Sequence, residues 1–307
     1  MTFIRPTLGA LALIAATLAS GVANAAPTTF YSTANVLAGN SDGSGDWVVG
    51  AANTSIKDSL SNTSGSVTYS GTNVGGSAAA MTFSYAARSI SGSGGLKAQA
   101  SANVSTPFDD RSPVVGLDLT PNYFFTVATA EMNDTLTVQS DIPLSYVTVS
   151  IRFHGDALKS TSDERVLSYG TLSGWNGALA NSTEGANDFT VNSGRLAVTN
   201  GTFDLYLHLR AALYIDITQK EGDVLNDFYI GNADFFNTAT IERISGFDAA
   251  GKPLDVATVT GTDGFSYQTV RVVDPTNPGN EVPEPGSLAL IGIGVASIAA
   301  IRRRTRR

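Results

Sequence analysis

Polar and apolar side chains alternate along residues 203–217, and this stretch holds the clearest candidate binding surface in the sequence. Its polar side begins at Asp204 and carries Tyr206, His208, Arg210 and Tyr214. On a β-strand, such residues share one face at steps of roughly 7 Å. Aromatic rings beside hydrogen-bonding groups are suited to stacking on sugars. We therefore take Tyr206, His208, Arg210 and Tyr214 as a candidate sugar-binding face.

Catalytic chemistry has little support among the residue types. The chain has no cysteine and two histidines, His154 and His208, which excludes thiol nucleophiles, three-histidine zinc sites and the H-E-x-x-H motif. Asp204 and His208 are four residues apart, roughly 13 Å along a strand, too far for a direct hydrogen bond. We expect His154 to end a strand at the surface. The sequence thus predicts a protein that is not an enzyme.

Carboxylates are plentiful, and they leave a secreted glycan-active hydrolase open as an alternative. Glycosidases need two carboxyl groups about 5 to 10 Å apart. No spacing within a β-protein sequence fixes such a distance, so this alternative depends on the three-dimensional structure.

Acidic loops are the candidate metal ligands. Asp42 and Asp46 flank Ser44 in a glycine-rich loop, and Ca²⁺ prefers oxygen donors from such loops. Further acidic clusters occur at Asp109-Asp110 and Glu221-x-Asp223. None of them fits the twelve-residue EF-hand pattern. We expect no cofactor, with a structural Ca²⁺ at Asp42 and Asp46 as the single candidate.

The overall charge restricts the partners. The 307 residues include 19 Lys+Arg and 27 Asp+Glu, for a net charge of −8. Nucleic-acid binding needs a basic footprint, so we expect no nucleic-acid partner.

Most of the chain is predicted to be β-structure that positions these side chains. Residues 147–153 and 203–217 alternate with period 2, as half-buried strands do. Turn-forming residues separate further strands between 238 and 273. Residues 28–107, rich in Ser, Thr, Asn, Gly and Ala, predict short strands on long flexible loops. The sequence therefore predicts an antiparallel β-sandwich of jelly-roll kind over residues 26–274.

The first 25 residues have the features of a secretory signal peptide. Arg5 precedes an apolar run over residues 8–19, and Ala23-Asn24-Ala25 provides a small-residue cleavage site. The run is too short to span a bilayer. We expect signal peptidase to recognise Ala23 and Ala25 and to cleave after Ala25, so that the body is exported.

The C-terminal segment has three parts. A proline-rich linker over residues 275–285 ends in Pro283, Glu284 and Pro285, and an uncharged apolar stretch follows over residues 287–301. The flanking prolines keep the motif extended and accessible. The chain then closes with Arg302, Arg303, Arg304, Arg306 and Arg307. We predict one transmembrane helix within residues 286–307, with the basic tail in the cytoplasm.

This tripartite arrangement resembles the PEP-CTERM sorting signal of Gram-negative bacteria, also catalogued as the ice-binding protein C-terminal motif. The resemblance covers residues 281–307. It implies that an exosortase recognises Pro283, Glu284 and Pro285 and processes the chain there. It also implies an intermediate in the inner membrane, followed by the cell surface or the extracellular matrix.

These features together predict an exported, exosortase-sorted surface protein. We expect a non-enzymatic component associated with exopolysaccharide or a biofilm matrix, with exopolysaccharide as a partner. The first alternative is a carbohydrate-binding or adhesive surface module, and the second is the secreted hydrolase.

Overall fold

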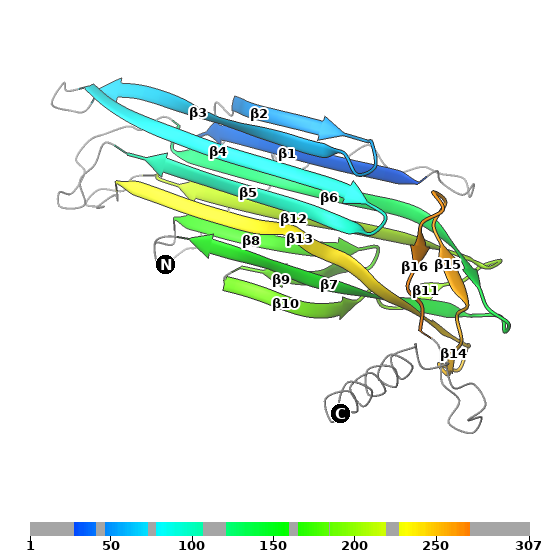
Figure 1. Cartoon of the computed structure of the whole chain (residues 1–307). Coiled ribbons are helices and arrows are strands. Elements are labelled where there is room, and N and C mark those ends of the chain that lie inside the picture. The colour runs from blue at the N-terminus through cyan, green and yellow to red at the C-terminus, as the bar shows by residue number, and fades with distance from the viewer. Residues whose placement is uncertain are drawn as a thin grey trace, which may run out of the picture. The chain divides into compact units, whose positions relative to one another are not determined.

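The computed structural model describes residues 28–40, 47–72, 78–106, 121–159, 165–183, 185–218 and 227–270. These residues form strands and no helix, which confirms the predicted all-β class. The strands, labelled in Figure 1, are β1 (Thr29–Gly39), β2 (Trp47–Thr54), β3 (Leu60–Thr72), β4 (Ala78–Gly92), β5 (Gly95–Ser105), β6 (Tyr123–Gln139), β7 (Tyr146–Lys159), β8 (Val166–Gly174), β9 (Gly177–Ser182), β10 (Gly185–Asn192), β11 (Leu196–Ala197), β12 (Thr202–Asp216), β13 (Phe228–Phe247), β14 (Pro253–Leu254), β15 (Thr258–Thr260) and β16 (Ser266–Tyr267).

The strands form two antiparallel sheets that stack face to face (Figure 1). Sheet A has the order β2-β1-β6-β12-β8-β9, and the hairpin β15-β16 pairs with the end of β6 beyond β1. Sheet B has the order β10-β7-β13-β5-β4-β3, with β11 added to β7 and β14 to β13.

From β5 to β13 the chain crosses between the sheets at almost every connection. Strands β5, β7, β10 and β13 lie in sheet B, whereas β6, β8, β9 and β12 lie in sheet A. The resulting orders, β5-β13-β7-β10 and β6-β12-β8-β9, are those of a jelly roll. The first four strands widen it, since β1 and β2 extend sheet A and β3 and β4 extend sheet B.

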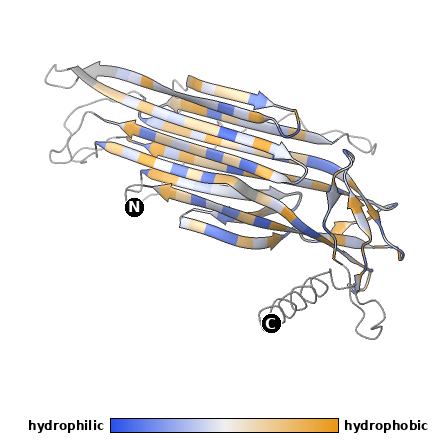
Figure 2. Cartoon of the chain, viewed as in Figure 1, coloured by the Kyte–Doolittle hydropathy of each residue, from blue (hydrophilic) through white to orange (hydrophobic). Residues whose placement is uncertain are grey.

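One apolar core lies between the sheets, because alternate side chains of each strand point inward. Along β6 and β12 buried and partly exposed positions alternate, and Figure 2 shows the matching alternation of hydropathy. Phe235 of β13 is fully buried and packs where Gly155 and Gly170 leave room. A Cβ at Gly155 would lie 2.4 Å from its ring, and one at Gly170 would lie 2.3 Å from it. Both glycines therefore make space for this ring.

The prediction for residues 28–107 was wrong in one respect. Strands β1, β3, β4 and β5 have 11 to 15 residues, so the described part consists mainly of long strands. The glycine-rich stretch 91–95 is a tight hairpin turn between β4 and β5, with Gly92 paired to Gly95. The alternation was weak in the sequence because the inward residues are small, as in Ala98, Ala100 and Ala102 of β5.

Buried serines connect the two sheets where these small residues let them approach. From sheet B, Ser89 of β4 donates to the carbonyl of Thr33 at 2.8 Å, and Ser61 of β3 donates to that of Ser32 at 2.8 Å. From sheet A, Ser168 of β8 donates to the carbonyl of Asn232 at 2.6 Å. A hydroxyl that would be costly if left alone in a core is here satisfied by a backbone acceptor of the opposite sheet.

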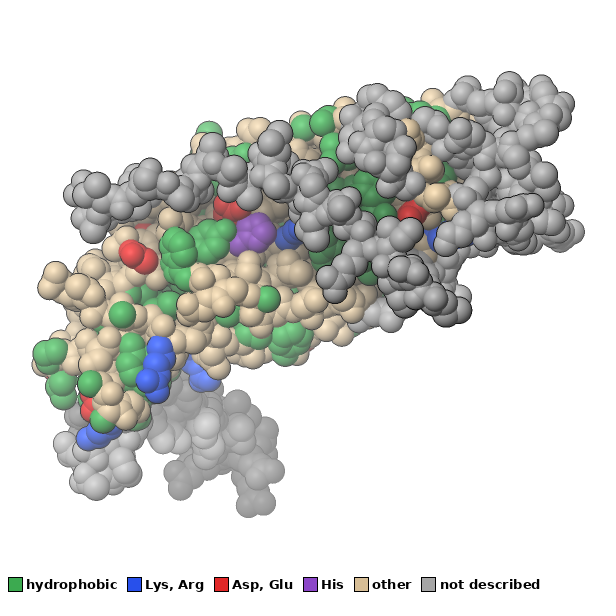
Figure 3. Space-filling model, turned by 180° about the vertical axis from the view of Figure 1, so that it is seen from behind, with side chains coloured by type: hydrophobic (Ala, Val, Ile, Leu, Met, Phe, Trp, Pro, Cys, Tyr) green, Lys and Arg blue, Asp and Glu red, His purple; other side chains and the backbone are tan. Residues whose placement is uncertain are grey.

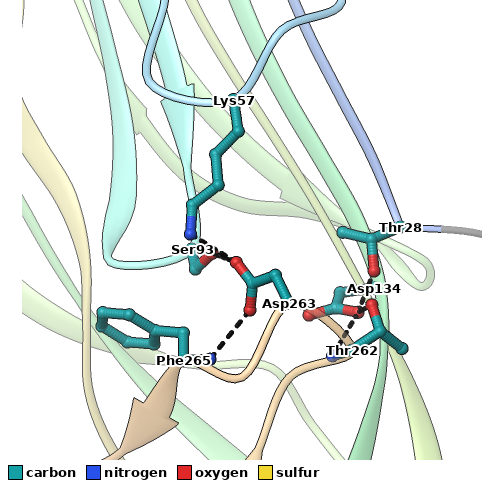
Figure 4. A network of polar contacts seen from close by, with 7 residues as sticks. All are labelled: Thr28, Lys57, Ser93, Asp134, Thr262, Asp263 and Phe265. Atoms are coloured by element: carbon teal, nitrogen blue, oxygen red, sulfur yellow. Dashed lines mark hydrogen bonds and ion pairs between the residues drawn. The ribbon is translucent and has the colours of Figure 1, made fainter.

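A polar network fastens the last hairpin, β15-β16, to the rest of the sandwich (Figure 4). Its turn carries Asp263, whose carboxylate accepts hydrogen bonds from Lys57 and Ser93 and, at 2.9 Å, from the backbone N–H of Phe265. Burial opposes ionisation of Asp263, but these hydrogen bonds and the charge of Lys57 lower its pKa to about 2. Asp263 is therefore an anion at neutral pH and pairs with the cation of the β2–β3 loop.

A second carboxylate lies beside the first. Asp134 of β6 points into the core and is 1% exposed. Its Oδ1 accepts hydrogen bonds from the hydroxyls of Thr28 at 2.5 Å and Thr262 at 2.8 Å. Gly261 lets the turn approach, since a Cβ there would lie 2.6 Å from Asp134 and 2.9 Å from Asp263. We call this set of residues (Thr28, Lys57, Ser93, Asp134, Thr262, Asp263) the hairpin latch.

Several expected segments lie outside the described residues. They are the signal peptide 1–25, the PEP motif, the helix within 286–307 and the arginine tail, and the boundary near residue 274 also stays a prediction. Over the residues that can be described, no helix is long and apolar enough to cross a membrane.

Candidate functional site

The outer face of sheet A gathers aromatic and titratable side chains from four neighbouring strands and the β8–β9 turn. In Figure 3, which views the sandwich from this side, hydrophobic side chains flank a histidine, with an acidic and a basic side chain nearby. The pairing of β12 with β6 and β8 brings these residues together in register. We call this surface the aromatic face, and it comprises Tyr31, Tyr123, Phe125, Glu131, Tyr169, Ser173, Trp175, Tyr206, His208, Arg210 and Tyr214.

Trp175 and Tyr206 form an exposed aromatic pair at one end of this face. Trp175 lies in the two-residue turn between β8 and β9, where Gly177 adopts a positive φ of 102°. Its ring centroid is 5.0 Å from that of Tyr206, and Trp175 is 58% exposed. A large ring held by a neighbour, yet open to solvent, provides a flat apolar platform with polar edges.

His208 of β12 lies between Glu131 of β6 and Ser173 of β8, in a row of side chains that runs across the strands. Its Nε2 is 3.5 Å from Oε1 of Glu131 on β6, and its Nδ1 is 3.4 Å from Oγ of Ser173 on β8. Burial, and then the charge of Arg210, lowers the pKa of His208, whereas burial raises the pKa of Glu131. His208 is therefore neutral at neutral pH, and it can both donate and accept hydrogen bonds.

Arg210 lies one step further along β12, between two aromatic rings. Its guanidinium carbon is 5.4 Å from the ring centroid of Phe125 and 5.7 Å from that of Tyr169. Tyr214 follows and packs edge to face against Tyr123 at 4.6 Å. Burial, followed by the charge of Asp216, raises the pKa of Tyr214, so its phenol stays protonated and able to donate.

The four residues chosen from the sequence thus share one outward face, as the alternation predicted. Glu131, Ser173 and Trp175 could not be identified from the sequence, because strand register decides which residues lie beside His208. A tryptophan in a turn followed by glycine, as in Trp175-Asn176-Gly177, is the one sequence signal that pointed to an exposed ring. Asp204, near the start of β12, accepts a hydrogen bond from Thr135 at 2.8 Å.

The Ser173–His208–Glu131 row has the residue types of a hydrolase triad, but its surroundings differ from one. A serine hydrolase needs N–H donors for the oxyanion of its intermediate. Here the backbone of β12 is paired with β6 on one side and β8 on the other. The row can exchange hydrogen bonds with a bound molecule through the Ser173 hydroxyl and the His208 ring.

One pentapeptide, residues 39–43 (Gly-Asn-Ser-Asp-Gly), matches the G-x-S-x-G pattern of α/β-hydrolases. That motif works on a turn from a strand into a helix. Here it follows β1, and the chain returns as β2, which pairs with β1 antiparallel. Ser41 to Gly43 of this match lie outside the described residues.

His154 lies on the outer face of sheet B. The expectation that it ends a strand was wrong, since β7 continues to Lys159: Gly155 pairs with Asn187 of β10, and Asp156 pairs with both β10 and β13. Its side chain is 54% exposed, and Nδ1 lies 3.8 Å from Oδ1 of Asp188. Arg152 donates to both oxygens of Asp188 at 2.8 and 2.7 Å, so these two opposite charges are paired with each other.

The candidate calcium residues Asp42 and Asp46 lie outside the described residues, as do the other acidic loop clusters. In the described ranges, no group of three or more acidic or histidine side chains is arranged to hold a metal ion.

Comparison with known proteins identifies the C-terminal segment. Residues 281–304 match the family described as PEP-CTERM protein-sorting motif. No curated protein matches the chain. The match covers Pro283, Glu284 and Pro285 together with the following apolar stretch and Arg302 to Arg304. The chain therefore carries a PEP-CTERM sorting motif at its C-terminal end and is targeted to exosortase as an extracellular protein.

Proposed function

We propose that this protein is a non-enzymatic component of the extracellular exopolysaccharide or biofilm matrix and that its aromatic face binds polysaccharide. Export and exosortase processing bring the sandwich to the cell surface. The observation that carries the binding role is the exposed Trp175 ring packed at a tilt of 40° against Tyr206, beside the hydrogen-bonding row of His208.

Sugar rings suit this surface for two reasons. One side of a pyranose presents C–H groups that pack on an aromatic ring, and its rim presents hydroxyls. The platform of Trp175 and Tyr206 meets the first need. His208 follows Tyr206 by two residues on β12, with Glu131 and Ser173 opposite it on the two neighbouring strands, and these side chains can exchange hydrogen bonds with hydroxyls.

The hydrolase alternative gains no comparable support. The hairpin latch brings two carboxylates together, Asp134 and Asp263, since a Cβ placed at Gly261 would meet both of them. Asp134 is almost fully buried and accepts two hydroxyl donors, and Asp263 pairs with Lys57. A polysaccharide cannot reach between these groups, so they favour a structural role.

The binding role is tested with the protein exported by its own cells. Retention on those cells' exopolysaccharide is compared for wild type, for Trp175→Ala with Tyr206→Ala, and for a control with Ser64→Ala and Ser66→Ala on the outer face of sheet B. Loss of two stacking rings, at about 1 kcal/mol each, should weaken retention at least about tenfold, and the control should match wild type. Equal retention of all three proteins would overturn the proposal.

The sorting step is tested separately. Deleting residues 302–307 or replacing Glu284→Gln should leave a larger form in the membrane fraction, visible on an immunoblot. Processing at the wild-type rate in both variants would show that the motif is not used.

A further inference from the structure

Arg210 is a cation at the centre of the aromatic face, and it has no counter-charge among the described residues. It makes no hydrogen bond or ion pair with any residue that the structure describes, and its Nε is buried without a partner. On the outer face of sheet B, by contrast, Arg152 donates to Asp188 and Arg88 donates to Gln99 at 2.6 Å. Burying part of a guanidinium without an acceptor costs free energy, which an external acceptor can recover.

The surroundings of Arg210 fix its geometry. Phe125 and Tyr169 lie on either side of the guanidinium, and Ala212, the next residue on this face, is small and fully buried. Neither aromatic ring offers a hydrogen-bond acceptor of the strength of a carboxylate, so the N–H groups of Arg210 remain available to a ligand. A planar guanidinium with free Nη groups recognises a carboxylate through two parallel hydrogen bonds.

The position of Arg210 relates it to the sugar platform. Arg210 and Tyr206 are four residues apart on β12, roughly 13 Å along the strand, with His208 between them. Thr129 and Thr171 face Arg210 across the two strand pairs and add hydroxyls beside it. A chain of sugars that follows β12 therefore passes the platform, the histidine row and the arginine in turn.

We propose that the aromatic face binds an acidic polysaccharide, with a sugar carboxylate on Arg210 and a neighbouring sugar ring on Trp175 and Tyr206. This inference rests on the polysaccharide-binding function and names the class of ligand. Asp204 and Asp216 lie at the two ends of the β12 row and repel carboxylates there. The face thus selects a chain whose carboxylate meets Arg210 in one register.

The test uses polygalacturonate and its fully methyl-esterified form, two polymers with the same sugar backbone that differ in charge. Retention on each is measured for the exported protein and for Arg210→Ala, Arg210→Lys and Arg152→Ala. Wild type should prefer the acid form about tenfold or more, the gain expected of a charge-assisted hydrogen-bonded pair. Arg210→Ala should lose the preference, Arg210→Lys should keep part of it, and Arg152→Ala should keep all of it.

The outcomes separate this inference from the function on which it rests. Equal wild-type retention on both polymers, abolished by Trp175→Ala with Tyr206→Ala, overturns the acidic ligand and leaves polysaccharide binding in place. Binding to the cells' own polysaccharide but to neither probe also overturns the acidic ligand. If a folded Arg210→Ala variant keeps the full preference for the acid form, the inference is also overturned, because a group other than Arg210 must then bind the carboxylate. No retention on any of the three polysaccharides overturns both proposals.

Discussion

The two outer faces of the sandwich treat their polar groups in opposite ways. On sheet B, Ser66 and Ser84 pair at 3.1 Å, Thr68 and Thr82 pair at 3.4 Å, and Arg152 is neutralised by Asp188. On sheet A, rings dominate, and Arg210 has no acceptor in the described part of the chain. Where polar side chains already hydrogen-bond to one another, a ligand adds little binding free energy. Where donors lack acceptors and a ring is exposed to solvent, a ligand adds new hydrogen bonds and ring contacts. This difference is the reason why we propose the ligand-binding surface on sheet A and not on sheet B.

The largest expected effect on stability tests the aromatic side of this comparison. Tyr214→Ala removes a half-buried ring from its contact with Tyr123 and should lower the free energy of unfolding by about 2 kcal/mol, less than a fully buried aromatic costs. Thr82→Ala, at an outward position of sheet B, should change it by less than about 0.5 kcal/mol. Urea unfolding measures both, and equal losses would contradict the contrast.

A smaller expected effect is the contribution of His208, on the aromatic face, to the pH dependence of stability. Because the pKa of His208 is lowered in the folded protein, the unfolded chain takes up its proton first as the pH falls below about 6.5. His208 therefore destabilises the fold progressively below that pH and has no such effect above it. His208→Gln should make the melting temperature less dependent on pH between 7 and 5. An unchanged slope would mean that His208 titrates normally.

The smallest effects compare one carboxylate from each face. Burial raises the pKa of Glu131, so its charge opposes folding at neutral pH, and Glu131→Gln should raise the melting temperature slightly. A hydrogen bond from Arg152 lowers the pKa of Asp188, so its contribution is present at neutral pH and lost as the pH falls below about 3.8. Asp188→Asn should therefore lower the melting temperature slightly at pH 7, and this effect should shrink as the pH falls below about 3.8. Shifts of the same sign at pH 7 would contradict the comparison.

The sequence predicted the polar side of β12 because its inward residues are large. Leu205, Leu207 and Leu209 alternate with Tyr206, His208 and Arg210, which makes the period unmistakable. The inward side of β5 is mainly alanine, and β4 contributes Ser89 and Ser91, so the same period was hidden. Small inward residues carry little apolar signal, although they let the sheets approach closely enough for serine-to-backbone bonds.

Contacts between strands could not be predicted from the sequence. Glu131 lies beside His208 because β6 and β12 pair in one particular register, and Ser173 joins them from β8. A shift of one residue would turn every one of these side chains to the other side of its sheet. The missing partner of Arg210 is likewise a property of the assembled face.

The hairpin latch has a mechanical consequence for a protein sorted through its C-terminal end. Tension on that end enters the sandwich at Val270, whose N–H donates to the carbonyl of Ile244 at 3.1 Å. Strands β15 and β16, which come just before, have only three and two residues and would peel apart under a small load. Asp263 and Thr262 tie their turn to Lys57 and Asp134, which belong to other parts of the sandwich. A force on the last hairpin is thereby borne also by Lys57 and Asp134, which are far from this hairpin in the sequence.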